Sequence, residues 1–292
     1  MPRLLPGWQA SVVGPPIFHI AEAGDWEAAR RVGGYRISTR GRTLEEVGFI
    51  HASHRQQVER VANAAYRHAG PLVLLTIEVD RLDVEVREES GGGGETFPHI
   101  YGPLPIGAVV AVGPLRPEPG GLFVPRQSWL SPKLDVRPSP IEGLGLFATS
   151  VIAEGEPVSV MGGRAMSDEE FAAYLATAER WSAAAVEEDL NVVQDENDPL
   201  RRGNHSCDPE LWMADELTLV ARRPIPVGQE ATIDYALMTV DETWTMLCRC
   251  GRQGCRATVT GTDWRRADLQ ARYRGHFSPF MERRITSGHA RP

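Results

Sequence analysis

The chain has 292 residues, of which 42% are hydrophobic and 24% charged, a composition typical of a soluble globular protein long enough for two domains. Its formal net charge of −8 argues against duplex DNA as the main partner, because phosphate binding needs concentrated positive charge. No apolar run is long enough to cross a membrane and the first residues do not resemble a secretory signal, so we expect a cytoplasmic protein without membrane contact.

The segment after the proline-rich start has the pattern of an α+β domain. A short helix is expected at 25–34, with Asp25 as its N-cap and glycine at its end. A longer helix is expected at 53–70, because Ser53 and Gln56 have the spacing of a capping box and valines and alanines recur on one face.

Two buried strands are predicted further along, at 71–79 and 107–115, where β-branched and leucine residues dominate. The glycine-rich segment between them, 89–103, predicts a mobile loop that leads into turns. Proline and glycine cluster again at 116–133, which is the best candidate for a domain boundary.

The rest of the chain has short strand-like pieces, one clear helix and a cysteine-rich tail. Ser167 and Glu170 form the capping box of this helix, whose apolar face carries Phe171, Tyr174 and Leu175. The predicted divisions are a tail (1–16), an α+β domain (17–124), a linker (125–132), a mostly β domain (133–245), a cysteine-rich tail (246–262) and a helical C-terminal extension (263–292).

All four cysteines lie in the second half of the chain, and three of them form a C-x-C-x₄-C pattern. Three thiols this close in a Gly- and Arg-rich loop cannot build a core, but they can surround one ion. Structural zinc takes four ligands, and a single cysteine remains to complete the set. We therefore predict one structural zinc, bound by Cys207, Cys248, Cys250 and Cys255.

Two alternatives compete with zinc at these cysteines. Buried thiols can act as small hydrophobic residues without any metal. Cys207 could also be a nucleophile with His205 as its base, although nothing in the neighbouring sequence orients that histidine.

Four separated motifs in residues 133–262 resemble those of SET-domain protein lysine methyltransferases. "IEGLGLFAT" is similar to the opening G-x-G segment of that family, and "GNHSCDPE" to its core motif. "VGQEATIDYA" is similar to the segment that ends in the active-site tyrosine, and "CRCGRQGC" to the zinc-binding post-SET tail. The resemblance implies a mostly β SET fold, with a post-SET tail that takes its fourth zinc ligand from the core motif.

The resemblance also implies the cofactor and the reaction. S-adenosylmethionine would donate a methyl group in line to a neutral lysine amine of a protein substrate, and Tyr235 would lie at the transfer point. The cofactor would contact Gly143, Leu144, Gly145, Asn204 and His205. From the chain's acidity we expect a basic bacterial protein as acceptor.

The chain departs from the family pattern at three places. Arg202 stands where relatives often have an aromatic residue, and Glu210 where they have asparagine. The strand "VSVMGGRA" lacks a tyrosine found in many relatives. These departures favour an alternative in which the chain is a non-catalytic, zinc-braced binding protein on a SET scaffold.

Residues 17–123 resemble the domain of unknown function 952 family, through "IFHI", "GGYRIST", "GFIHASHRQQV" and "FPHIYGPL". That family is sometimes grouped with ADP-ribosyltransferase-like folds, and chemistry on a nicotinamide dinucleotide in this domain is a third interpretation. The polar residues of these motifs are candidates for a pocket: His19, Tyr35, Ser38, His51, His99 and Tyr101. The sequence does not identify a glutamate that pairs with them.

Overall fold

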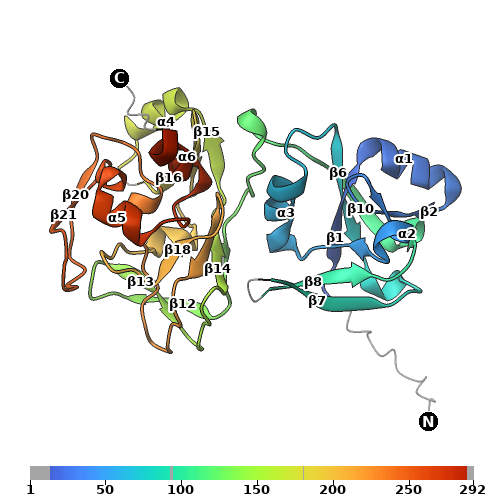
Figure 1. The fold of residues 1–292 in the computed structure, drawn as a ribbon, viewed down its shortest axis with the longest axis horizontal. Coiled ribbons are helices and arrows are strands. Elements are labelled where there is room, and N and C mark those ends of the chain that lie inside the picture. The colour runs from blue at the N-terminus through green and yellow to red at the C-terminus, as the bar shows by residue number, and fades with distance from the viewer. Residues whose placement is uncertain (1–13, 93–94, 180, 288–292) are drawn as a thin grey trace, which may run out of the picture. The chain divides into compact units, whose positions relative to one another are not determined.

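The structure, a computed structural model, describes residues 14–92, 95–179 and 181–287 (Figure 1). Most of the predicted tail 1–16 and the last five residues of the predicted C-terminal extension lie outside these ranges. The chain forms two compact units, the first mostly from residues before 117 and the second mostly from residue 117 onward. No helix in the described ranges is long and apolar enough to cross a membrane.

The first unit is α+β, as the sequence predicts, and its strands form small antiparallel sheets. One sheet has the order β1-β6-β10 and a second β5-β8-β7, while β2 pairs with β9 and β3 with β4. The elements are β1 Ile17–Glu22, α1 Ala23–Val32, β2 Gly34–Tyr35, β3 Ile37–Thr39, β4 Arg42–Thr43, α2 Leu44–Val47, β5 Ile50–His51, α3 Val58–Ala65, β6 Leu72–Ile77, β7 Val86–Gly92, β8 Glu95–Ile100, β9 Leu104–Pro105 and β10 Val109–Leu115.

Both predicted helix starts in this unit are wrong by a short distance. Helix α1 begins at Ala23, so Asp25 lies in its first turn, and the N-cap Glu22 makes no side-chain capping bond. For the helix predicted at 53–70, the capping box is formed by His54 and Gln57, one residue later than predicted, and it begins a 3₁₀ turn (Arg55–Gln57) that leads into α3. Each shift follows from the preceding strand or bridge, which holds the chain extended up to the first helical residue.

The glycine-rich segment is not simply a mobile loop, which corrects the sequence prediction. Residues 86–92 form β7 and residues 95–100 form β8. Strand β8 lies between β5 and β7, so its backbone groups pair on both sides. That pairing outweighs the low strand preference of glycine.

The second unit is mostly β, and its described residues form three short α-helices. The largest sheet has the order β11-β14-β19-β18, a second β15-β17-β16, and β12 pairs with β13 and β20 with β21. The elements are β11 Trp129–Leu130, β12 Leu134–Pro138, β13 Leu144–Ala148, β14 Pro157–Val160, β15 Arg164–Met166, α4 Asp168–Leu175, β16 Ala183–Glu187, β17 Leu190–Val193, β18 Leu211–Met213, β19 Thr218–Ala221, β20 Thr245–Leu247, β21 Thr258–Thr260, α5 Ala267–Arg272 and α6 Pro279–Ser287. The predicted capping box of Ser167 and Glu170 is present at α4.

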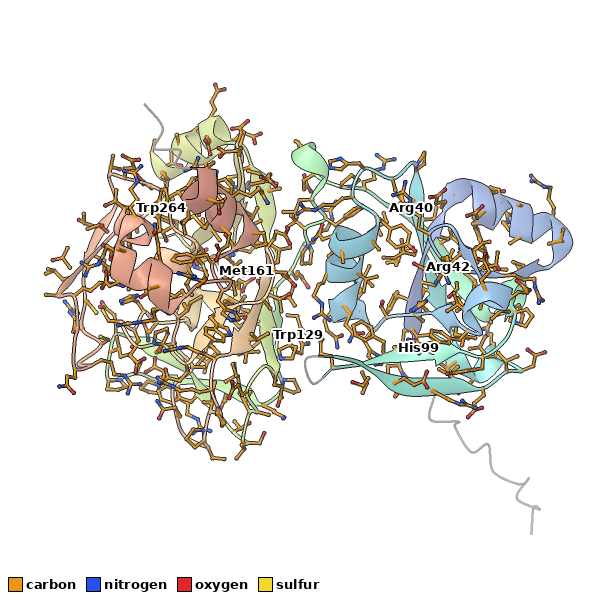
Figure 2. All side chains as sticks on the ribbon, in the orientation of Figure 1. Arg40, Arg42, His99, Trp129, Met161 and Trp264 are labelled. Atoms are coloured by element: carbon orange, nitrogen blue, oxygen red, sulfur yellow. The ribbon has the colours of Figure 1, made fainter. Side chains whose placement is uncertain are left out.

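The C-terminal extension is part of the core of the second unit. Trp264, Tyr273, Phe277 and Phe280 are almost fully buried and pack with the apolar residues of β13, β14 and β19. Helix α6 contacts β16, and Figure 2 labels Trp264 among the side chains of this region. Residues 263–281 therefore help to hold the fold that positions the site.

Candidate functional site

The structure brings all four cysteine sulfurs together. Their Sγ atoms lie within 4.8 Å of one another, and those of Cys207 and Cys248 are 3.7 Å apart. Four sulfurs at ~2.3 Å from a tetrahedral zinc would be about 3.8 Å from each other. The spacing therefore fits a closed four-thiolate zinc site and leaves no place for a catalytic water on the ion.

Backbone N–H groups donate to two of the four sulfurs. The backbone N–H of Arg256 donates to Cys207 Sγ at 3.3 Å, and that of Ala257 to Cys255 Sγ at 3.4 Å. Without a cation, burial raises the pKa of the Cys207 thiol to about 11, so binding a divalent ion there must release a proton. The loop turns around the sulfurs at Gly251 and Gly254, whose φ angles of 64° and 81° suit glycine.

Glu210, one of the departures from the family pattern, is buried and fully bonded. Its carboxylate accepts hydrogen bonds from Arg252 (2.7 Å), Arg223 (3.2 Å), Gln229 (3.1 Å) and Thr232 (2.6 Å). Arg252 lies between Cys250 and Cys255 in the segment that joins β20 and β21, residues 248–257, which we call the cysteine loop. Glu210 thus connects the cysteine loop to the core motif, and these donors offset the desolvation of its buried carboxylate.

A buried ion-pair network joins the cysteine loop to the segment that carries Tyr235. The guanidinium of Arg256 donates to both carboxylate oxygens of Asp234 at 2.7 Å, and the Tyr273 hydroxyl donates to the same carboxylate at 3.0 Å. Asp263 lies 3.0 Å from Arg256 on its other side. Arg256 and Asp234 side chains are 6% and 0% exposed, so these charges depend on each other.

Tyr235 is fixed at both ends. Its hydroxyl donates to the Gly203 carbonyl at 2.8 Å, and its backbone N–H donates to Nδ1 of His205 at 3.2 Å. Burial, with the negative charges of Glu142 and Glu230, raises the pKa of Tyr235 to about 12, so the phenol keeps its proton near neutral pH.

His205 contacts Tyr235 with one ring nitrogen and Cys207 with the other. With Nδ1 accepting from Tyr235, its proton is on Nε2, 3.4 Å from Cys207 Sγ. Burial lowers the pKa of His205 to about 4. A ring that is neutral and already donates to the sulfur cannot take a proton from it at that nitrogen, which disfavours Cys207 as a His205-activated nucleophile.

The Gly143–Gly145 turn is held by Asn204 and Glu230. The amide of Asn204 donates to the carbonyls of Glu142 and Leu144 at 3.2 and 3.0 Å, and to Glu230 at 2.8 Å. An added Cβ at Gly145 would lie 2.1 Å from a Glu230 carboxylate oxygen. The side chain of Asn204 therefore braces the turn, while Leu144 is 41% exposed at its surface.

We expect Gly145→Ala to destabilise the second unit by about 1–3 kcal/mol, because Glu230 is held by Ser139 and Asn204 and cannot move aside freely. Gly107→Ala is the control, since nothing lies within 4 Å of its added Cβ. Urea unfolding of both variants checks this. Equal shifts for the two substitutions would contradict it.

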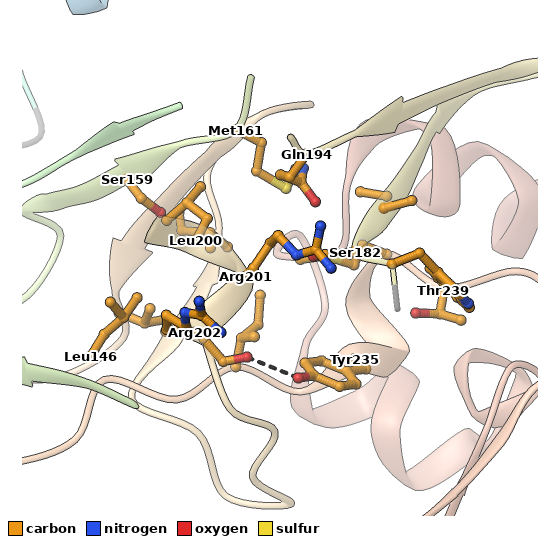
Figure 3. A pocket seen from close by; sticks show the side chains of 18 of the residues that line it. Leu146, Ser159, Met161, Ser182, Gln194, Leu200, Arg201, Arg202, Tyr235 and Thr239 are labelled. Carbon is orange, nitrogen blue, oxygen red and sulfur yellow. Dashed lines mark hydrogen bonds between the residues drawn. The ribbon is translucent and has the colours of Figure 1, made fainter. Parts of the chain in front are cut away.

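A cavity of ≈ 410 Å³ opens beside Tyr235 in the second unit (Figure 3). Its wall includes Ser159, Met161, Trp181, Gln194 and Trp244. Arg201 and Arg202, from the 3₁₀ turn Pro199–Arg202, also line it. Of the predicted SET-site residues, Tyr235 lines this cavity, whereas Gly143, Leu144, Gly145, Asn204 and His205 are not among its wall residues.

The predicted polar residues of the first unit form two groups. His19 is buried, with Nδ1 2.6 Å from the His51 carbonyl and Nε2 3.0 Å from the Tyr35 hydroxyl, and burial lowers its pKa to about 4. Both ring nitrogens are engaged inside the protein, so His19 and Tyr35 have a structural role here.

The second group surrounds His51 and His99, which pair across strands of the sheet β5-β8-β7, and includes Ser38 from β3 and Tyr101 just after β8. Ser38 Oγ is 3.0 Å from Nδ1 of His51, and Glu89 is 2.6 Å from Nδ1 of His99. Tyr101 also donates to Glu89, at 2.7 Å. The two imidazole rings are 5.2 Å apart, and Figure 2 labels His99 on this sheet.

Several functional candidates were not identified from the sequence: Glu89, Arg201, Glu230, Asp234 and Arg256. Glu89 lies in the glycine-rich segment that predicts a loop, and only its place on β7 reveals its pairing with His99. Arg256 directly follows a predicted zinc ligand, which was the one available signal.

Two known families match separate parts of the chain. Residues 20–112 match the family described as "Protein of unknown function (DUF952)", and residues 143–236 match the SET domain. The chain therefore carries a DUF952 domain followed by a SET domain.

Individual relatives cover parts of the chain. It is 33% identical over 63 residues to Histone-lysine N-methyltransferase SETD1 of Drosophila melanogaster, covering 19% of this chain and 4% of that protein. It is 33% identical over 73 residues to Methyltransferase flvH of Aspergillus flavus, covering 24% of this chain and 41% of that protein. The chain thus spans less than half of the length of either curated relative.

A solved structure, that of Protein CC0527 from Caulobacter crescentus, is 30% identical. The likeness covers 37% of this chain and 92% of that one, with a TM-score of 0.34.

Proposed function

We propose that the chain is an S-adenosylmethionine-dependent protein-lysine N-methyltransferase with one structural zinc. The observation that carries the proposal is the placement of Tyr235 in a SET domain, with its hydroxyl fixed on the wall of a cavity large enough for a lysine side chain. The acceptor would be a protein with an accessible lysine, with no requirement for a membrane or nucleic acid.

The residues at this site fit such a cofactor. An added Cβ at Gly143 would meet nothing within 4 Å, so open space lies beside this turn, and Leu144 is exposed at its surface. Arg249 of the cysteine loop pairs with Glu142 of this turn at 3.1 Å, so loop and turn face the same region. S-adenosylmethionine, when bound there, supplies an electrophilic methyl group on a sulfonium.

The chain's own residues would orient and desolvate the acceptor. The apolar and aromatic part of the wall, which includes Met161, Trp181 and Trp244, would exclude water from a lysine amine, which lowers the pKa of that amine and exposes its lone pair. The Tyr235 oxygen can accept a hydrogen bond from the amine while its own O–H donates to the Gly203 carbonyl. These contacts fix the direction of the lone pair for in-line attack.

The zinc would be structural. Four thiolates complete its coordination, so its role is to hold the cysteine loop against the core motif and the segment of Tyr235.

Tyr235→Phe is expected to lower methyl transfer by about 100-fold or more, because the amine loses its orienting oxygen. Purified protein is incubated with methyl-labelled S-adenosylmethionine and a lysine-rich bacterial lysate, and label on protein lysines is measured. His51→Ala, in the other unit, is the control and should keep full activity. No label with a wild-type protein that binds zinc would favour the non-catalytic binding protein.

A second candidate function places acid–base chemistry in the DUF952 domain. The observation in its favour is the pair His51 and His99, each held at Nδ1 by a polar side chain. Burial, then the neighbouring His99, lowers the pKa of His51, which leaves it neutral and able to act as a base. Activity lost in His51→Ala and kept in Tyr235→Phe would support this candidate.

A further inference from the structure

The wall of the Tyr235 cavity carries two arginines without partners. Neither Arg201 nor Arg202 has a hydrogen-bonded or ion-paired partner for its guanidinium among the described residues, and both are half-buried. Figure 3 shows the guanidinium of Arg201 reaching into the space between Gln194 and Tyr235, with Arg202 beside Leu146. Their backbone is fixed by Asp198, which caps the 3₁₀ turn.

This lack of partners is unusual for half-buried arginines of the second unit. Arg222, Arg223, Arg252 and Arg256 all bind carboxylates at 3.2 Å or less. A guanidinium cannot shed its charge by losing a proton, so partial burial without a counter-charge has an uncompensated desolvation cost. An anion that entered the cavity would remove that cost.

The chemistry of the wall selects the anion. Glu179 is the one acid among the described residues of this cavity, which gives its wall a formal charge of +1. Asp195 and Glu196 line a neighbouring cavity with the same two arginines, without forming an ion pair with either. Guanidinium groups present a planar fork of donors that matches a carboxylate. A cation near the acceptor also disfavours the protonated amine, so the same arginines would help to keep the reacting nitrogen neutral.

We propose that Arg201 and Arg202 form a carboxylate-binding subsite beside Tyr235, which selects a ligand carrying a carboxylate close to the methylated amine. This inference rests on the proposed methyltransferase function. The carboxylate belongs either to an acidic residue next to the acceptor lysine or to the methionine part of the cofactor.

The test compares two lysine peptides, one with glutamate and one with glutamine beside the lysine, on the wild type, Arg201→Gln and Arg202→Gln. Binding is measured by calorimetry and, separately, methyl transfer by label. We expect the wild type to prefer the glutamate peptide by about 10- to 100-fold, and each substitution to remove most of that preference. Arg274→Gln, at an exposed arginine of the second unit that does not line this cavity or the neighbouring one that Arg201 and Arg202 also line, is the control and should keep the preference.

A cofactor arm distinguishes the source of the carboxylate. If the subsite serves the cofactor, both variants bind S-adenosylmethionine about 10- to 100-fold more weakly, bind its decarboxylated analogue as the wild type does, and show no change between peptides. Equal binding of all carboxylate and amide probes by wild type and variants would overturn the subsite. Because binding is read without turnover, peptide discrimination with no label would mean that the methyltransferase proposal fails and the subsite stands.

Stability provides a readout that separates the subsite from a structural role. Removal of an unpaired, half-buried cation should leave the thermal midpoint unchanged or raise it. A clear fall in the midpoint of Arg202→Gln would show that the guanidinium supports the fold, and would count against the subsite.

Discussion

Removal of zinc is expected to release the cysteine loop and abolish methyl transfer, the largest single effect foreseen for this chain. No residue of the cysteine loop, 248–257, is fully buried, and Leu247 just before it is 74% exposed, so the ion is the main source of the loop's stability. Structural zinc binding in small sites contributes on the order of 10 kcal/mol near neutral pH, and a chelator withdraws that contribution. The purified protein should hold about one zinc per chain, which elemental analysis measures.

Hydrogen exchange gives the position of this effect. Chelation should speed exchange in β20 and β21, which flank the cysteine loop, and leave β1, β6 and β10 unchanged as an internal control. Cys250→Ser should reproduce the pattern without a chelator. A metal-free protein with the exchange and thermal midpoint of the untreated sample would contradict the zinc site.

The second large effect is expected from Arg256→Ala, which should cost about 3–5 kcal/mol of the second unit's stability. The substitution leaves the Asp234 carboxyl group buried without its bidentate partner. Arg249→Ala is a matched control from the same loop, because its pair with Glu142 is 64% and 65% exposed and is worth ~0–1 kcal/mol. Urea unfolding at neutral pH measures both.

Arg256→Ala should also separate positioning from stability. Asp234 directly precedes Tyr235 and holds the backbone of Ala236, so its displacement moves the phenol from the Gly203 carbonyl. We expect kcat to fall more than KM changes, with Arg256→Lys recovering part of kcat. Similar losses in Arg256→Ala and Arg249→Ala would refute the network's special role.

The features visible in the sequence are those carried by neighbouring residues. The capping box of Ser167 and Glu170 is a local pattern, and the structure has it. The spacing of the cysteines is local too, and the structure brings their sulfurs together. The starts of the two helices predicted in the first unit are wrong, because the strand or bridge before each helix sets its first residue. Local capping rules do not contain that constraint.

The network around the site could not be predicted, because its members are far apart in the chain. Arg256 meets Asp234 over 22 residues, and Asn204 meets Leu144 over 60. Asn204 has the donors and acceptor of a ligand contact, and only the folded chain shows that its amide braces the turn. Glu210 looked like a departure until its partner Arg252 was located in the cysteine loop.

The place of the C-terminal segment in the second unit has a consequence for the order of events during synthesis. Residues 248–281 supply three zinc ligands, the guanidinium that holds Asp234 and the aromatic side chains that close the core. A ribosome adds these residues after every other part of the site has left the peptidyl-transferase centre. The DUF952 domain can fold while translation continues, whereas the cavity beside Tyr235 takes its final form only once α6 has emerged from the exit tunnel.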